Sequence, residues 1–418
     1  MSVTAVAMEK SNEATETDDA IMVSSNHFIE EFDSDAAEYV DHILTEALRV
    51  SASDVFVTFR EHCVEIAIRT MGFVKSLGVI NRELGARLMS HIKATADMDV
   101  TRSFLPQDGR TYIRLKNGNS IDLRLATLPT LYGEDMTMRL LDRRRLINIE
   151  EIGFHPTNFA RLHSIIGRPG GLVLVSGPTG MGKTTTLYAV LKHLNDGTRK
   201  IHTIEDPIEF TLEGIHQSQV NVRRGVDFPD LLRGILRQSP DIIMVGEIRD
   251  TVTADIVVRA ANSGQLVFAT SHARTTVEAC EAMIVLGVQP QFLASGLLGV
   301  VTQRLIRKLC THCRIPLQPG EVFDVQTSHN EQMYIPSGCP ECHNTGYAGR
   351  IAVGEVLRVT REVERMIRSG ASMYQIHQRA VEEGMIDLRA DAQQKLDLGI
   401  TSPDEILRVI PGNFAETF

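Results

Sequence analysis

The spacing of apolar residues divides the chain into three stretches. Up to residue 36 large apolar side chains are few and acidic ones are common, so residues 1–36 are predicted to form an acidic, disordered tail. Residues 37–142 combine segments with helical spacing of apolar residues and runs in which every second residue is apolar, which predicts a small α+β domain. The basic run Asp142-Arg-Arg-Arg145 marks its end, and residues 143–152 are predicted to be a linker.

After residue 153 short apolar strands alternate with helix-length segments. Four strands are predicted at residues 172–176, 200–204, 242–245 and 266–270. Strands this apolar are typical of a parallel sheet that helices cover on both faces. Helix start signals at Thr360 and Thr401 predict that residues 354–418 are helical. Residues 153–418 are therefore expected to form one α/β domain.

Length and composition narrow the class of protein. A chain of 418 residues is too long for one ordinary core, and an apolar content of 43% is usual for a globular protein. No run approaches eighteen apolar residues and the amino terminus lacks a secretory signal pattern, so a cytoplasmic protein is expected. The net charge of -10 disfavours a surface that neutralises phosphate backbones, so no nucleic acid partner is expected.

A phosphate-binding loop is the most specific motif. It follows the predicted strand 172–176, precedes an apolar run that suits a helix, and matches G-x-x-x-x-G-K-[ST] at every position. Glycines let backbone N–H groups turn towards a polyphosphate, the lysine reaches the β- and γ-phosphates, and the threonine hydroxyl binds Mg²⁺. A nucleoside triphosphate is therefore expected to bind to Gly177, Pro178, Thr179, Gly180, Met181, Gly182, Lys183, Thr184 and Thr185.

Acidic residues at the ends of neighbouring strands are candidates for the chemistry. Glu205 and Glu247 each follow an apolar run, where a carboxylate can hold hydrated Mg²⁺ or orient an attacking water. A solvated strand end is the alternative for either one. His272 follows a fourth apolar strand, where such sheets place a γ-phosphate sensor. Arginines can neutralise charge on the reacting phosphates, and spacing does not choose among Arg124, Arg139, Arg233, Arg237 and Arg249.

Four of the six cysteines form two Cys-x-x-Cys pairs with twenty-five residues between them, namely Cys310, Cys313, Cys339 and Cys342. In a reducing compartment this spacing indicates metal and not disulfides, and four thiolates suit a tetrahedral zinc site. A site with four protein ligands has no open position for a substrate. Zn²⁺ is therefore predicted to stabilise a loop or a docking surface.

Taken together, these motifs resemble the secretion ATPases that assemble type IV pili and drive type II secretion. Thr203-Ile-Glu-Asp-Pro-Ile-Glu209 is similar to that family's aspartate box and Val245-Gly-Glu-Ile-Arg-Asp250 to its Walker B segment. Ala269-Thr-Ser-His272 is similar to its histidine box. The resemblance covers about residues 36–412 and includes the stretches around the four cysteines.

The resemblance implies a RecA-like ATPase domain at residues 153–418, with a zinc insert at 307–350, preceded by a smaller PAS-like α+β domain. It implies a homo-hexamer that hydrolyses ATP in the cytoplasm and associates peripherally with the inner membrane through a platform protein. It also assigns roles: Lys183 and Thr184 bind phosphate and Mg²⁺, Glu205 activates water, Glu247 belongs to the metal shell, His272 senses the phosphate, and Arg124 and Arg139 reach the phosphates.

Several functions remain possible on this core. Retraction ATPases of type IV pili usually lack the four cysteines, so the resemblance favours a motor that extends a pilus or a type II secretion pseudopilus. A retraction ATPase and a conjugation or DNA-translocating ATPase are the alternatives, and DNA-stimulated turnover would favour the latter. A regulatory module that binds ATP and hydrolyses little is a third, and it predicts no effect of Glu205→Gln or Glu247→Gln.

Overall fold

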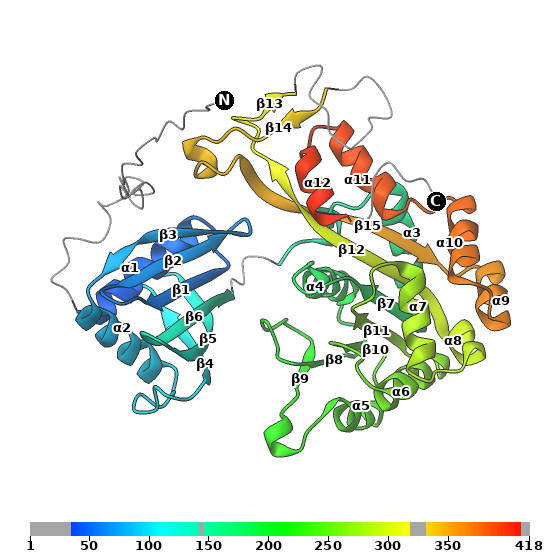
Figure 1. Cartoon of the computed structure of the whole chain (residues 1–418). Helices are drawn as coiled ribbons and strands as arrows, with labels where there is room; N and C mark the ends of the chain where they lie inside the picture. The colour runs from blue at the N-terminus through cyan, green and yellow to red at the C-terminus, as the bar shows by residue number, and fades with distance from the viewer. Residues whose placement is uncertain (1–34, 142–145, 318–331, 411–418) are drawn as a thin grey trace, which may run out of the picture. The chain divides into compact units, whose positions relative to one another are not determined.

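The structure is a computed structural model of the chain, and it describes residues 35–141, 146–317 and 332–410 (Figure 1). Nearly all of the predicted tail, and the first part of the predicted linker, lie outside these residues. The chain divides after Leu140 into two compact units, each of which is described by itself. Within the described ranges, no helix is both long enough and apolar enough to cross a membrane.

From residue 35 onward, the first unit is a six-stranded sheet with two helices. The strand order is β3-β2-β1-β6-β5-β4, and β1 pairs antiparallel with both β2 and β6. Both helices pack against β1 and against each other. The elements are α1 (Ala36–Arg49), β1 (Asp54–Phe59), β2 (Val64–Thr70), β3 (Phe73–Ile80), α2 (Arg82–Thr95), β4 (Gln107–Arg114), β5 (Ser120–Thr130) and β6 (Gly133–Leu141).

Amphipathic spacing explains why these helices cover the sheet. In α1 the residues Tyr39, Ile43 and Ala47 recur at intervals of four and are all buried, so one stripe of the helix faces the core. The helix α2 begins at Asn81, whose side chain accepts a hydrogen bond from the N–H of Leu84 at 2.8 Å. One apolar core joins the two helices to the sheet, and the expected α+β fold of this region is confirmed.

The second unit is built on a seven-stranded sheet of order β15-β12-β7-β11-β10-β8-β9. The neighbours from β12 to β9 are parallel, and β15 runs antiparallel to β12. The four parallel strands predicted from apolar runs are present, so the α/β fold is confirmed. They are β7 (Gly171–Ser176), β8 (Ile201–Glu205), β10 (Ile242–Val245) and β11 (Leu266–Ser271). Two further parallel strands, β9 (His216–Gln219) and β12 (Leu297–Leu309), were not predicted.

Helices cover both faces of this sheet, as the continuous apolar strands require. In β7 the side chains of Leu172 and Leu174 belong to one core, and those of Val173 and Val175 belong to the core on the opposite face. The first core includes α5 (Phe228–Leu236), α6 (Thr251–Asn262), α7 (Thr276–Val285) and α8 (Pro290–Gly296), and the second includes α3 (Pro156–Ile166) and α4 (Lys183–Leu194).

The carboxyl-terminal region begins with a strand, so the helical prediction for residues 354–358 is wrong. These residues end β15 (Tyr347–Arg358), which pairs with β12 over most of its length. The strand is not evident from the sequence because the segment contains a glycine and charged residues. In the structure its Val356 and Leu357 are buried. The helices that follow are α9 (Arg361–Ser369), α10 (Met373–Glu382), α11 (Leu388–Asp397) and α12 (Pro403–Val409).

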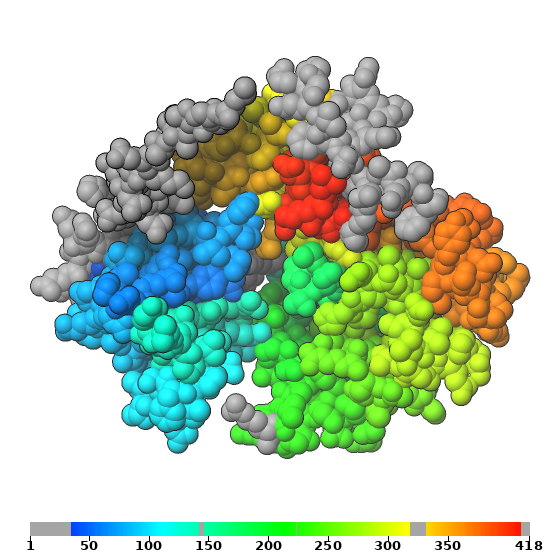
Figure 2. Space-filling model, in the orientation of Figure 1, coloured from blue at the N-terminus to red at the C-terminus, as the bar shows by residue number. Residues whose placement is uncertain are grey.

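Two groups of helices result at this end of the chain. The helices α9 and α10 pack against α8 and α7 and continue the surface of the second unit (Figure 2). The helices α11 and α12 pack instead on the outer strands β15 and β12, with a small core of their own. In the sequence, the segment that connects β12 to β15 contains the short strands β13 (Ile315–Pro316) and β14 (Tyr334–Ile335) and the four cysteines.

Candidate active site

The phosphate loop connects β7 to α4, and its glycines hold conformations that other residues rarely adopt. Gly177, Gly180 and Gly182 have φ values of 141°, 80° and 78°. Gly177 is also fixed by space, because a Cβ there would lie 2.6 Å from the carbonyl oxygen of Gln303. The loop then delivers Lys183 and Thr184 into the first turn of α4, where backbone N–H groups have no partner within the helix. Such a turn is suited to bind an anion.

The ammonium group of Lys183 lies against the backbone of this loop. Its Nζ donates hydrogen bonds to the carbonyl oxygens of Gly177 at 2.5 Å and Pro178 at 3.2 Å. Burial lowers the pKa of Lys183, and the nearby Glu247 carboxylate opposes that shift. The carboxylate therefore helps to keep the amine charged, which is the form that binds phosphate oxygens.

Glu247, Arg249 and His272 form a polar cluster beyond the ends of β10 and β11. Arg249 makes an ion pair with Oε1 of Glu247, and Nε2 of His272 lies 3.4 Å from Oε2 of the same carboxylate. The other ring nitrogen of His272, Nδ1, lies 3.4 Å from Nζ of Lys183. The imidazole thus bridges the phosphate-loop lysine and Glu247, and the structure brings these four predicted residues together.

Glu205 is held more tightly than the sequence suggests. Its side chain is buried, Oε1 accepts hydrogen bonds from Thr203 at 2.6 Å and Gln217 at 3.0 Å, and Oε2 accepts one from the Tyr188 hydroxyl. A carboxylate offers about four lone-pair directions, so these three donors leave one on Oε2. Burial, followed by the Glu205 charge, raises the pKa of Tyr188, which therefore stays a donor. Glu205 can therefore accept one further hydrogen bond, from a fixed direction on Oε2.

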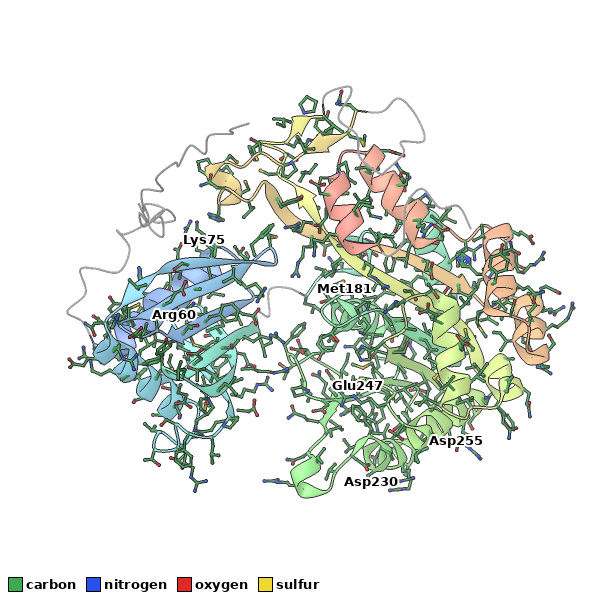
Figure 3. The ribbon with its side chains drawn as sticks, viewed as in Figure 1. Arg60, Lys75, Met181, Asp230, Glu247 and Asp255 are labelled. Atoms are coloured by element: carbon green, nitrogen blue, oxygen red, sulfur yellow. The ribbon has the colours of Figure 1, made fainter. Side chains whose placement is uncertain are left out.

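Thr184, Glu205 and Glu247 line one small pocket at the carboxyl ends of β8, β10 and β11. Its volume of about 80 Å³ suits a few waters and a small cation rather than a whole nucleotide. Met181 of the phosphate loop and Glu247 are labelled in Figure 3. Hydroxyl and carboxylate oxygens are the ligands that Mg²⁺ prefers, so the residues present fit that ion.

The remaining predicted arginines are not brought to this pocket within the second unit. Arg233 lies on α5 and pairs with Asp230 at 3.3 Å, and Arg237 caps the end of the same helix. Arg124 and Arg139 belong to the first unit, where Arg124 lies on β5 and Arg139 donates to Asp54 at 3.0 Å. A role for Arg124 and Arg139 at the phosphates stays a prediction.

The phosphate loop has a support that the sequence reading missed. Gln303 of β12 accepts a hydrogen bond from Oγ1 of Thr186 at 2.8 Å and donates one to the carbonyl oxygen of Met181 at 2.6 Å. It therefore ties the loop to α4 and to the sheet. The signal available in the sequence is the polar triplet Thr302-Gln303-Arg304 inside an apolar run. In the structure all three residues are at most 3% exposed. Tyr188, which donates to Glu205, was missed as well.

The four cysteines form a cluster whose geometry fits one metal ion. Their Sγ atoms lie within 4.8 Å of one another. The distances from Cys339 to Cys310 and Cys342 are 3.8 and 3.7 Å, and Cys313 lies 3.7 Å from Cys342. Four sulfurs at about 2.3 Å from a tetrahedral zinc ion would lie about 3.8 Å apart. Backbone N–H groups of Cys339 and Gly346 donate to Sγ of Cys342 at 3.2 Å, which stabilises a thiolate.

Comparison with known proteins identifies relatives over most of the chain. Residues 30–408 match the family model described as Type II/IV secretion system protein. The chain is 42% identical to the Type II secretion system protein HxcR of Pseudomonas aeruginosa, over 88% of this chain and 76% of that protein. It is 40% identical to the Type II secretion system protein E of Klebsiella pneumoniae (92% and 78%) and 38% identical to the Type II secretion system ATPase E of Vibrio cholerae (91% and 76%).

Solved structures share the fold. The Legionella pneumophila ATPase DotB aligns with a TM-score of 0.67 and 19% identity, over 91% of this chain and 97% of that one. The pilus retraction motor PilT with bound ADP aligns with a TM-score of 0.64 and 23% identity, over 88% and 96%. At these identities the likeness concerns the architecture, which is a mixed α/β sheet of the kind found in those ATPases.

Proposed function

The chain belongs to the Type II/IV secretion system protein family, and from that premise we propose that it powers assembly of a type II secretion pseudopilus or a type IV pilus. It is a secretion ATPase, an enzyme that binds ATP with Mg²⁺ and hydrolyses it. The observation that carries the proposal is the contact of Lys183, in a complete phosphate loop, with His272, and of His272 with Glu247. Identity of about 40% to type II secretion proteins supports the cellular role.

The side chains suggest a division of labour. Lys183 would bind the phosphates, because its ammonium is fixed within the loop. Glu205 would align the attacking water through the one direction that its three donors leave on Oε2. His272 would report the phosphate end of the nucleotide to Glu247, because its ring lies between the two charged groups. Arg249 would hold the Glu247 carboxylate in place.

Mg²⁺ would be held by Thr184 and Glu247, and when bound it neutralises charge on the phosphates. Both residues line the small pocket with Glu205. The chain's own contribution is to bring the oxygen ligands of Thr184 and Glu247 and the carboxylate of Glu205 to one pocket. The buried apolar strands beneath keep these positions fixed.

The assembly that would use this activity is a homo-hexamer on the cytoplasmic face of the inner membrane, in contact with a platform protein. Family membership supports the assembly, and the four cysteines favour extension or secretion over retraction. A suitable test is light scattering and ATP turnover of the purified full chain with Mg²⁺. We expect a hexameric mass, turnover per subunit that rises as the hexamer forms, and no stimulation by DNA. Turnover that DNA stimulates several-fold would instead support a DNA-translocating motor.

The cysteine cluster is proposed to hold one structural zinc ion. Metal analysis of the purified chain should give one zinc per chain, because the four sulfurs already have tetrahedral spacing. Cys339→Ser should lose that zinc, whereas Cys63→Ser, which changes a cysteine of the first unit outside the cluster, should retain it. Equal zinc content in the two variants would contradict the assignment.

A further inference from the structure

A second pocket, of about 260 Å³, lies at the edge of the sheet opposite to the phosphate loop. Its lining includes Arg168, which follows α3, Arg358 at the end of β15, and Thr360 and Arg361 at the start of α9. Since β7 begins beside Leu298 at this pocket and ends at the phosphate loop, its six residues separate the two sites by roughly 20 Å. We call this feature the arginine pocket.

The arginine pocket concentrates positive charge that no carboxylate of the described residues neutralises. Within the part of the chain that the structure describes, Arg168, Arg358 and Arg361 have no ion pair and no side-chain hydrogen bond. On the same helix, Arg365 and Arg368 each pair with a glutamate at 2.6 Å. The chain has a net charge of -10 and therefore many carboxylates that could pair with arginines. Three unpaired arginines at one pocket are thus an unusual local arrangement.

Neighbouring groups do not neutralise the positive charge of the arginine pocket. Arg161 of α3 lies close enough for its pKa, lowered mainly by burial, to be lowered further by Arg358. The carboxylate of Glu383 accepts a hydrogen bond from Thr360, which lines the pocket, at 3.2 Å. That carboxylate is already paired with Arg379 at 3.0 Å. The pocket therefore carries net positive charge on several sides.

We propose that the arginine pocket binds a phosphate group. Guanidinium groups match tetrahedral oxyanions through paired N–H donors, and three of them can neutralise a dianion, whereas a single carboxylate would leave most of the charge unmatched. Thr360 caps the nine-residue helix α9, so that helix also directs its positive end to the pocket. The site is distinct from the phosphate loop, which lies at the other end of β7, and it does not depend on the proposed cellular role.

The test is isothermal titration of the full chain with inorganic phosphate while saturating Mg²⁺·ADP occupies the phosphate loop. We expect one phosphate per chain, and binding at least about tenfold weaker in the double variant Arg168→Gln, Arg358→Gln, because each change removes a charge-assisted donor. The matched control is Arg365→Gln, Arg368→Gln, which removes two arginines of α9 that do not line the pocket. That control should bind as the unaltered chain does.

A second arm distinguishes a soluble anion from a lipid headgroup. Co-flotation with phosphatidylglycerol vesicles, compared with phosphatidylcholine vesicles, is measured for the same variants. Phosphate binding without vesicle binding supports a soluble phosphate ligand, and vesicle binding that only the pocket variant loses supports the same chemistry on a lipid. Absence of both, or equal binding by the pocket variant and the control, overturns the proposal.

Discussion

Replacing Lys183 by alanine is expected to lower ATP turnover about a hundred- to a thousandfold. The physical reason is that Lys183 is the ammonium group fixed to the phosphate loop, at 2.5 Å from the Gly177 oxygen and 3.4 Å from His272. Its removal takes away the charge that would stabilise the reacting phosphates and breaks the link from the loop to Glu247. The measurement is steady-state release of phosphate by the purified variant at saturating Mg²⁺·ATP.

The same helix offers a matched control. Lys192 lies on α4, and its ammonium donates to Asn148 at 3.0 Å on the exposed surface. Lys192→Ala removes an equal charge from the helix without touching the loop, so its turnover should stay close to that of the unaltered chain. If Lys183→Ala kept turnover within about threefold of that control, the phosphate-loop assignment would be wrong.

Replacing Glu405 by glutamine is expected to destabilise the carboxyl-terminal part of the second unit by about 3–5 kcal/mol. The Glu405 side chain is fully buried and accepts hydrogen bonds from Nε and Nη2 of Arg307 at 2.9 and 2.6 Å and from Arg408. The variant would leave the largely buried Arg307 guanidinium without its anion. Hydrogen exchange of peptides from β12 and α12 should show the loss as faster local opening.

The stabilisation by Glu405 should also depend on pH. Burial alone would raise the pKa of this carboxyl, but hydrogen bonds from Arg408 and Arg307 outweigh it and the pKa is lowered. A lowered folded-state pKa means that the stabilisation is complete above the unfolded-state value of about 4.3 and is lost as the pH falls through the folded-state value. The difference between the unaltered chain and Glu405→Gln should therefore shrink in acid.

An exposed glutamate provides the comparison. Glu382 of α10 pairs with Arg379 at 3.3 Å and is largely exposed, so Glu382→Gln should change local stability by less than about 1 kcal/mol. Similar exchange rates in the Glu382 and Glu405 variants would show that the buried pair does not hold α12 to β12.

The parts that could be predicted from sequence are those whose physical signals are local. The phosphate loop needs particular residues at fixed offsets, and the central parallel strands can be recognised as short apolar runs. Glu247 is predicted because it follows an apolar strand and a glycine that allows close approach, and His272 because it follows another apolar strand. Local chain order was enough to place these side chains at one edge of the sheet.

The parts that were missed depend on contacts between distant segments. Gln303 reaches a loop more than one hundred residues earlier in the chain, and a glutamine in a strand gives no local sign of its partner. The strand at 354–358 contains Gly354, which is required because a Cβ would lie 2.4 Å from the ring of Phe154. The same lack of a local signal left the choice among the five arginines open, and in the second unit Arg249 pairs with Glu247.

The strand β12 has a mechanical consequence for the second unit. Two residues of this thirteen-residue strand form hydrogen bonds to other segments: Gln303 to the phosphate loop and Arg307 to Glu405 of α12. Cys310, which directly follows the strand, belongs to the cysteine cluster. The seven residue steps from Gln303 to Cys310 span roughly 23 Å, and pairing with β15 stiffens most of that length. A tilt of roughly 2–3° at the loop would therefore swing the cluster by about 1 Å, so that β12 acts as a lever arm.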